Sequence, residues 1–162
     1  MRERGFTLVE LLVVTGIIML FSAFIFPNFN MGEKNLALER SSAKLAQDLG
    51  RVRSMAMSAK KFTGAPSTFR GSYGIKFETN FSSYILFADL NNNQSLDLGE
   101  TVETILLEKN IKIGTISPSP LIIIFTPPNP STNIISTATI VLTNSTRTKN
   151  IEVNKAGLIN IK

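Results

Sequence analysis

The sequence contains no cysteine and no histidine, and these two absences exclude many catalytic and metal sites. Without cysteine the chain has no disulfides, no Cys-ligated zinc and no catalytic thiol. Without histidine it has no Ser-His-Asp triad and no His-ligated metal. Catalysis would then require a cluster of convergent carboxylates in a deep pocket. The composition therefore favours a protein that is not an enzyme and that acts through its surfaces.

Charge is also scarce, since only 18% of the 162 residues are charged whereas 43% are hydrophobic. Disordered chains have the opposite balance, so we expect a folded chain. Seventeen Lys and Arg against twelve Asp and Glu give a net charge of +5. The length suits one domain, or a small domain with an anchor.

Charged residues are almost missing from the N-terminal part, where Glu10 is the only one between Arg4 and Glu33. A helix of residues 6–26 would be roughly 30 Å long, enough to cross a bilayer. Two arginines precede it, and by the positive-inside rule they keep the N-terminus cytoplasmic and send the remainder outward. We predict a transmembrane helix at residues 6–26; the alternative is a buried helix of a soluble domain.

Glu10 is unusual because it lies inside this apolar segment. An ionised carboxylate in hydrocarbon costs on the order of 3 kcal/mol, so such residues usually have a partner and a function. The alternative is a carboxylate near the helix start that reaches the membrane interface, where the helix dipole favours negative charge. Glu10 is therefore a candidate functional residue.

Glu10 also belongs to a longer pattern: a short basic leader, then Gly5 and Phe6, then Glu10 within a long apolar run. This pattern closely resembles the class III signal of type IV pilins and type II secretion pseudopilins. The resemblance implies that a prepilin peptidase removes the leader 1–5 by cutting between Gly5 and Phe6. It also implies that Phe6 becomes the N-methylated N-terminus and that Glu10 acts in filament assembly.

A physical reason supports this assignment of Glu10. Cutting after Gly5 creates a free amine on Phe6, and the Glu10 carboxylate of a neighbouring subunit can neutralise it. In a medium of low dielectric the attraction is large, although desolvation offsets much of it. The pair is therefore expected to set the register of assembly more than its net stability.

Beyond the apolar segment the hydrophobic period changes twice. Pro27, Asn28, Asn30 and Gly32 are expected to weaken the helix, which continues as an amphipathic helix within residues 27–61. Residues 62–162 alternate with period two, as strands do. Strands are predicted at 73–77, 84–88, 101–107, 111–116, 121–125, 139–143, 148–153 and 158–161. The expected fold class is α+β, a long N-terminal helix packed on an antiparallel β-sheet, and this order of elements looks like that of the H-type minor pseudopilins.

A polar segment at 89–100 has the spacing of a calcium-binding loop. Its positions 1, 3, 5, 7, 9 and 12 carry oxygen-bearing side chains, as in an EF-hand: Asp89, Asn91, Asn93, Ser95, Asp97 and Glu100. Against this, Gln94 occupies the position that normally requires glycine, and the flanks are predicted strands. The sequence therefore leaves two interpretations, a weak Ca²⁺ site or a polar turn between strands.

Together these features predict a structural subunit, a minor pilin or pseudopilin, of a type IV pilus or type II secretion filament. Its expected partners are other pilin or pseudopilin subunits, the prepilin peptidase and methylase, and the cell membrane, with the globular domain outside. The alternative is a DNA-binding minor pilin of a DNA-uptake filament, since excess positive charge favours phosphates. Seven basic and three acidic residues fall within 33–61, whereas eight and seven fall within 62–162. The excess lies on the helix that assembly would cover, so the structural role is preferred.

Overall fold

In the computed structural model, one long helix precedes eight strands. The structure describes residues 5–162 apart from 64, 66–68, 70 and 130, and within the helix the side chains of residues 25–30 lie outside the description. The elements are α1 (Leu8–Met57), β1 (Tyr73–Phe77), β2 (Ser83–Ala88), β3 (Thr101–Leu106), β4 (Lys112–Ser117), β5 (Leu121–Phe125), β6 (Thr137–Thr143), β7 (Thr148–Asn154) and β8 (Ile159–Ile161).

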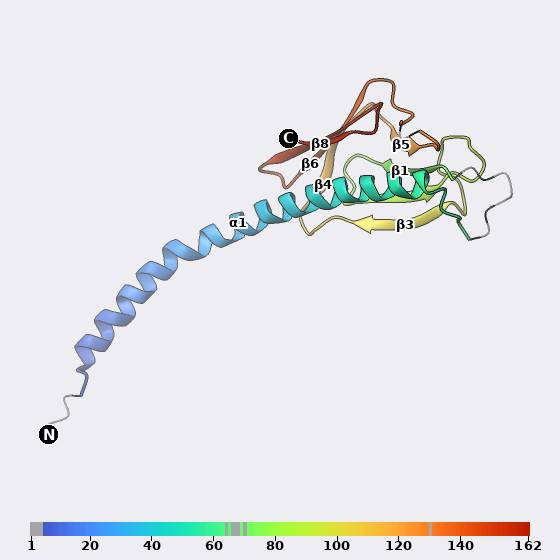
Figure 1. Cartoon of the computed structure of the whole chain (residues 1–162). Helices are drawn as coiled ribbons and strands as arrows, with labels where there is room; N and C mark the ends of the chain where they lie inside the picture. Colours follow the sequence, from blue (N-terminus) through green and yellow to red (C-terminus); the bar gives the residue numbers. More distant parts are fainter. Residues whose placement is uncertain (1–4, 64, 66–68, 70, 130) are drawn as a thin grey trace.

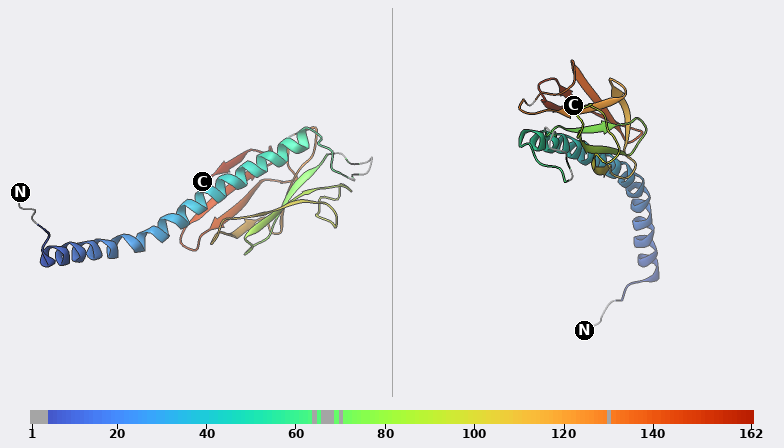
Figure 2. Two further views of the ribbon diagram at one scale, coloured as in Figure 1. Left: turned by 90° about the horizontal axis from the view of Figure 1, so that it is seen from below. Right: turned by 90° about the vertical axis from the view of Figure 1, so that its right-hand side faces the viewer.

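Helix α1 is a single element of 50 residues that bends gently along its length (Figure 1). Its first half extends away from the rest of the molecule, and its second half lies across the strands (Figures 1 and 2). The expected weakening falls partly on Pro27, Asn28 and Asn30, whose side chains are outside the described part. The backbone nevertheless remains helical through them and through Gly32.

The strands form two four-stranded antiparallel sheets where the sequence predicted one. The first sheet has the order β3-β2-β1-β5, and the second has the order β4-β6-β7-β8. In the first sheet Ile75 lies opposite Leu86 of β2 and Ile123 of β5. In the second sheet Ile140 lies opposite Ile151. Neighbouring strands in the chain thus often belong to different sheets, which local periodicity does not reveal.

The core lies between α1 and the two sheets. The helix contributes an apolar stripe with spacings of three and four residues, in which Leu45, Leu49 and Val52 are fully buried. The first sheet contributes alternate residues of β1 and β2, and the second contributes alternate residues of β6 and β7. One cluster of buried side chains therefore joins all three layers.

Buried polar side chains fix the position of the helix on the sheets, with one such group on each sheet. On the first sheet, the Tyr84 hydroxyl donates a hydrogen bond of 2.7 Å to Oδ2 of Asp48, and both residues are buried. On the second, the Asn144 amide donates to the carbonyl oxygen of Lys34 and to Oδ1 of Asn35, each at 3.1 Å. Because these buried polar groups find their partners only when the helix and the sheets are in this register, the contacts fix the packing of the helix.

The predicted fold class is confirmed, since a long N-terminal helix packs on antiparallel sheets. The predicted strands all occur, with ends that differ by one or two residues, and 73–77 and 121–125 match in full. The helix ends at Met57, four residues before the expected limit. Beyond it Ala59 adopts a φ of 45°, a left-handed conformation that cannot continue the helix.

The Tyr84–Asp48 contact predicts a measurable stability loss. Tyr84→Phe removes the hydroxyl and leaves a buried carboxylate without that donor, which should cost about 1–3 kcal/mol. The measurement is a thermal melt of the full chain in detergent. Tyr73→Phe is the matched control, because its hydroxyl donates to the carbonyl oxygen of Lys60 at the end of the helix and not to a buried charge. Equal melting temperatures for Tyr84→Phe and the wild type would contradict the role of this contact.

Candidate functional site

The predicted cleavage junction lies just before the first turn of α1. Residues 5–7 are outside the helix and exposed, and the Phe6 side chain is 84% exposed. Around Gly5 a Cβ atom would meet no other described atom within 4 Å. The peptide bond between Gly5 and Phe6 is therefore open to an enzyme that approaches from outside the domain.

Glu10 and Thr7 form a reciprocal cap at the start of the helix. The Glu10 amide donates to Oγ1 of Thr7 at 3.2 Å, while Oε2 of Glu10 accepts from the Thr7 amide at 3.0 Å and the Thr7 hydroxyl at 2.8 Å. This is a capping box, which satisfies two backbone N–H groups that the helix leaves free. Glu10 is thereby held at the N-terminal turn, with its carboxylate directed toward the chain that precedes the helix.

Thr7 was not recognised from the sequence as part of this site. The signal was present, because a threonine followed three residues later by a glutamate before an apolar run is the sequence signature of a capping box. The structure adds that both Thr7 donors use the same oxygen of Glu10. Within the described residues the other oxygen, Oε1, accepts no hydrogen bond from Thr7 and can accept from an incoming donor.

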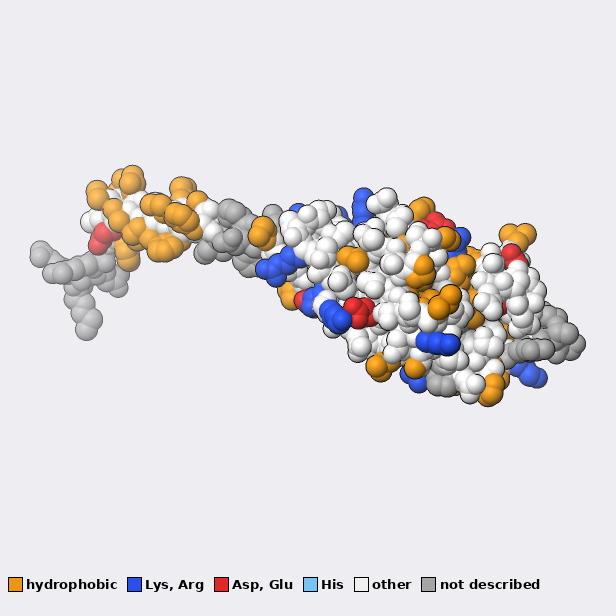
Figure 3. All heavy atoms as spheres, turned by 90° about the horizontal axis from the view of Figure 1, so that it is seen from above, with side chains coloured by type: hydrophobic (Ala, Val, Ile, Leu, Met, Phe, Trp, Pro, Cys, Tyr) orange, Lys and Arg blue, Asp and Glu red, His pale blue; other side chains and the backbone are white. Residues whose placement is uncertain are grey.

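The first half of α1 exposes its apolar side chains, and Figure 3 shows them along the face turned toward the viewer. Together with Phe6, which lies just before the helix, thirteen large ones are exposed in the single chain: Phe6, Leu8, Val9, Leu11, Leu12, Val13, Val14, Ile17, Ile18, Met19, Leu20, Phe21 and Phe24. We call residues 6–24 the apolar extension. The predicted membrane span 6–26 runs past it into residues whose side chains are not described. Taken over the described residues alone, no helix combines the length and the apolar character that a membrane crossing demands.

The acidic loop between β2 and β3 is closed by hydrogen bonds to its two end residues. Asp89 and Glu100 are 1% and 2% exposed. The Asp89 carboxylate accepts from the amides of Asn93 and Gln94, each at 3.1 Å. Glu100 accepts from the amides of Leu90 at 2.8 Å and Asp97 at 2.9 Å. The first and last predicted calcium ligands are therefore the residues that fold the loop.

The other predicted ligands lie on the exposed part of the loop. Asn91 and Asn93 both donate side-chain hydrogen bonds to Oδ2 of Asp97, at 2.7 and 2.6 Å, and the Ser95 amide donates to Oδ1 of Asn93 at 2.8 Å. Across the described parts of the chain, no group of three acidic side chains is placed to hold a metal ion. Calcium binding stays a prediction, and the loop as described satisfies its oxygens with its own donors.

Gln94 shows why glycine is usual at its position. Its φ is 62°, in the left-handed region that glycine enters without steric cost and that other residues enter at about 1 kcal/mol or more. The loop therefore makes the sharp turn of a calcium loop even though glycine is missing. In the described part of the chain, the spacing of the oxygen-bearing residues and the turn are both present, whereas the convergence of carboxylates is not.

Burial has an electrostatic consequence for Asp89. Loss of hydration raises the pKa of the Asp89 carboxyl above its ordinary value. Hydrogen bonds from the amides of Gln94 and Asn93 act in the opposite direction, and the nearby charge of Glu100 raises the pKa further. The folded loop therefore holds a proton on Asp89 more tightly than the unfolded chain does.

Comparison with known proteins gives two matches at the sequence level. Residues 1–26 match the family described as the prokaryotic N-terminal methylation motif. Over 100 residues the chain is 33% identical to the pilin-like protein PilA1 of Thermus thermophilus, covering 62% of this chain and 57% of that protein. The chain thus matches less than two thirds of the length of this relative. No solved structure gives a match.

The pKa of Asp89 predicts a pH dependence of stability. Because the pKa is raised in the folded state, this group's contribution is greatest when it is protonated and falls as the pH rises above about 4 through the folded-state pKa. In thermal melts of the full chain in detergent and EDTA, the melting temperature of the wild type should fall relative to that of Asp89→Asn as the pH rises over that range. Parallel pH profiles for the two proteins would contradict the raised pKa.

The same melts at neutral pH, with excess calcium in place of EDTA, test the predicted ion. A ligand that binds only the folded state at ten times its Kd adds about 1.4 kcal/mol, so the melting temperature should rise by several degrees. Magnesium should add much less, because it requires a tighter octahedral site. Asp89→Ala should abolish the calcium response. Superimposable melts in EDTA and calcium would overturn the calcium prediction and leave the polar turn.

Proposed function

We propose that this chain is a type IV pilin or pseudopilin, because residues 1–26 match the prokaryotic N-terminal methylation motif and the chain is similar to a pilin-like protein. A prepilin peptidase cuts between Gly5 and Phe6, the apolar extension anchors the protein in the cell membrane, and the same extension then packs in a filament as a minor pilin or pseudopilin. The globular domain lies outside the membrane. The observation that supports this most directly is the apolar extension itself.

The apolar extension is too costly to leave in water. Burying one Val, Leu, Ile, Met or Phe side chain gains about 2 kcal/mol, so thirteen of them represent on the order of 20–30 kcal/mol. That exceeds the 5–15 kcal/mol by which a typical domain is stable. The described part of the domain does not cover these side chains, so lipid tails or other protein helices must do so.

Glu10 supplies the specificity that lipid cannot. Helices gain little hydrophobic free energy by associating inside lipid, because lipid tails are as apolar as leucine. In the proposed mechanism the amine of Phe6, freed by cleavage, is neutralised by Oε1 of Glu10 on a neighbouring subunit, while Oε2 remains held by Thr7. Because a buried charge tolerates few arrangements, this pair fixes the stagger between helices.

A structural role agrees with the surface of the domain. An open hollow of about 550 Å³ lies between the end of β4 and the segment 133–137, and among the described residues no ionisable side chain lines it. With neither histidine nor cysteine in the chain, it offers no general base and no nucleophile beyond Ser and Thr hydroxyls. We therefore assign the protein a structural and not a catalytic role.

The alternative function, DNA binding in an uptake filament, depends on cations that are free to replace counterions. Five of the fourteen described Lys and Arg are engaged in ion pairs with carboxylates: Arg40 with Glu108, Arg51 with Glu103, Lys76 with Glu78, Lys149 with Glu39 and Lys162 with Glu152. Several of the others lie where the apolar extension joins the domain, a place that the membrane or the filament would cover in the proposed function. The structural role is therefore preferred.

Processing gives the first test of the proposed function. The protein isolated from its own host should lack residues 1–5 and carry N-methyl-phenylalanine at Phe6, which mass spectrometry of the N-terminal peptide will detect. Gly5→Leu should block the cut, because the added side chain changes the junction without touching the folded domain. Filament-associated protein that retains Met1 would overturn the proposal.

The second test concerns Glu10. Glu10→Gln keeps the size of the side chain and one acceptor for the Thr7 amide but removes the charge. We expect it to be processed and membrane-inserted but to enter filaments at least tenfold less, since the Phe6 amine of the neighbouring subunit would be left without a counter-charge in apolar surroundings, which costs more than about 1.4 kcal/mol. The control is Glu33→Gln, the same change in the same helix beyond the apolar extension. Glu10→Gln filaments at wild-type abundance would contradict the pairing role.

A further inference from the structure

We propose that the end of the globular domain nearest the apolar extension docks on anionic lipid headgroups of the membrane that the extension enters. This inference rests on the proposed function, because it requires the extension to lie in a bilayer. The surface consists of four exposed cations, Lys34, Lys109, Lys112 and Arg147, which we call the basic collar. Figure 3 shows Lys and Arg side chains where the extension joins the domain.

Three segments far apart in the sequence bring the collar together. Lys34 and Lys109 line one hollow of about 220 Å³ between α1 and the turn that joins β3 to β4. The turn that joins β6 to β7 is held to α1 by the Asn144 amide, which donates to the carbonyl oxygen of Lys34 at 3.1 Å. The oxygen of the same Asn144 side chain accepts from the Arg147 amide at 2.7 Å. Lys112 lies opposite Thr143, the residue before Asn144.

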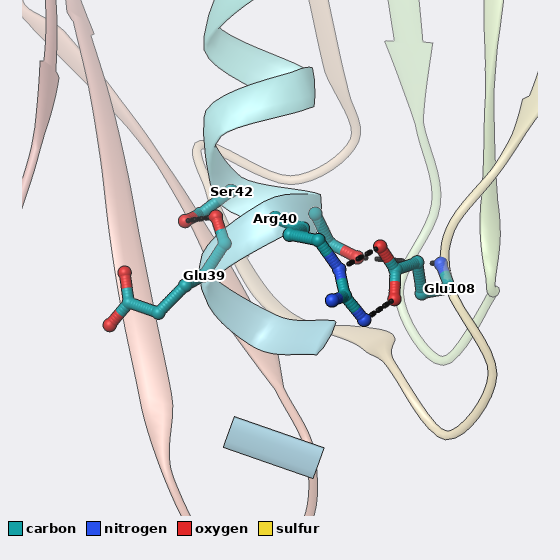
Figure 4. Close-up of polar contacts among 5 residues, drawn as sticks. Glu39, Arg40, Ser42 and Glu108 are labelled. Atoms are coloured by element: carbon teal, nitrogen blue, oxygen red, sulfur yellow. Dashed lines mark hydrogen bonds and ion pairs between the residues drawn. The ribbon is translucent and has the colours of Figure 1, made fainter. Parts of the chain in front are cut away.

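The collar cations differ in their ion pairing from Arg40, which lies farther along α1 from the apolar extension. Arg40 forms a two-point contact with Glu108, Nε to Oε1 at 2.8 Å and Nη2 to Oε2 at 2.9 Å (Figure 4). This contact lowers the pKa of the Glu108 carboxyl, so the pair stays ionised and mutually neutralised. Within the described part of the chain, none of the four collar cations forms an ion pair. Against their four charges, the same hollow contains one further carboxylate, Glu33.

The helix places the collar at the height of the headgroups. Lys34 follows residue 26 by eight helical positions, and at about 1.5 Å each it lies roughly 12 Å above the hydrocarbon edge. A headgroup layer occupies about 5–8 Å of that distance. The Debye length of about 8–10 Å exceeds the remainder. The collar therefore lies within electrostatic range of the lipid phosphates.

The position of the collar identifies its partner. In the proposed topology the collar lies on the translocated side of the membrane, close to the helix in space although most of it is distant in sequence. Because the collar continues the surface of the apolar extension, the partner that meets both at once is an anionic lipid bilayer, and not DNA.

The opposite end of the domain has a different charge. There the acidic loop carries Asp89, Asp97 and Glu100, and the exposed cations Lys60, Lys61 and Lys155 lie near the end of α1 and in the turn after β7. Neutralising these three changes the net charge as much as neutralising three collar residues does. They therefore give a matched control at the far end of the same molecule.

The test uses the full chain in vesicles of phosphatidylcholine alone or of an equimolar mixture with phosphatidylglycerol. Flotation after a high-salt wash in both vesicles establishes insertion, so a protein that fails to float overturns the proposed anchoring and the collar with it. For inserted protein, hydrogen exchange of amides in 33–36, 108–112 and 143–148 should be slowed at least fivefold by phosphatidylglycerol, since each cation near an anionic leaflet strengthens binding about fivefold. High salt should reverse the effect.

The variants identify the cations responsible. Lys34→Gln/Lys109→Gln/Arg147→Gln should float like the wild type but exchange equally fast in both vesicles. The control, Lys60→Gln/Lys61→Gln/Lys155→Gln, should keep the slowed exchange. Equal exchange of the wild type in both vesicles would overturn the collar while leaving the anchoring intact. If the slowed hydrogen exchange depends on the protein-to-lipid ratio at constant lipid composition, the collar proposal is also overturned. The surface would then be assigned to contact with a second copy of the chain.

Discussion

The packing of one apolar stripe of α1 against two sheets is the interaction on which the rest of the structure depends. Each sheet has one apolar face, and the stripe that contains Leu45 and Leu49 covers both faces at once. Without it the sheets would expose those faces to water. The stripe begins near Ala37, so the helix before that point has no sheet to pack on in the described part of the chain. The same element is therefore a core helix in its second half and an uncovered apolar surface in its first.

Polar contacts convert this apolar packing into a single arrangement. Hydrophobic burial is non-directional, so the stripe alone would tolerate sliding along the sheets. Tyr84 and Asp48 permit one register on the first sheet, and Asn144 permits one on the second. Because α1 is one continuous helix, fixing its second half on both sheets also fixes the direction in which the apolar extension leaves the domain. A subunit that packs through its extension needs that direction to be reproducible.

Much of this was accessible from the sequence, for reasons that particular residues make plain. The run 121–125 and the alternation in 73–77 give strands whose ends match, because their periods are local properties. The division into two sheets was not accessible, since β1 pairs with β5 across the intervening β2–β4. The Thr7–Glu10 cap was overlooked although its spacing was visible. For the acidic loop the spacing was clear, but spacing does not determine whether Asp89 and Glu100 turn toward an ion or toward backbone amides.

In the proposed function, the choice between membrane and filament depends on a few charged groups. Moving the extension from lipid to a bundle of like helices exchanges one apolar environment for another. The hydrophobic free energy of the extension is therefore nearly the same in both. What remains are the few charged groups at its two ends. At the N-terminal end Glu10 gains a partner only in the proposed filament, which favours departure from lipid. At the other end the basic collar would lose its headgroups on departure, which opposes it. The balance between an assembled and a membrane-resident subunit is then set by charges at the two ends of one helix, and salt and lipid composition act on the collar far more than on the shielded Glu10.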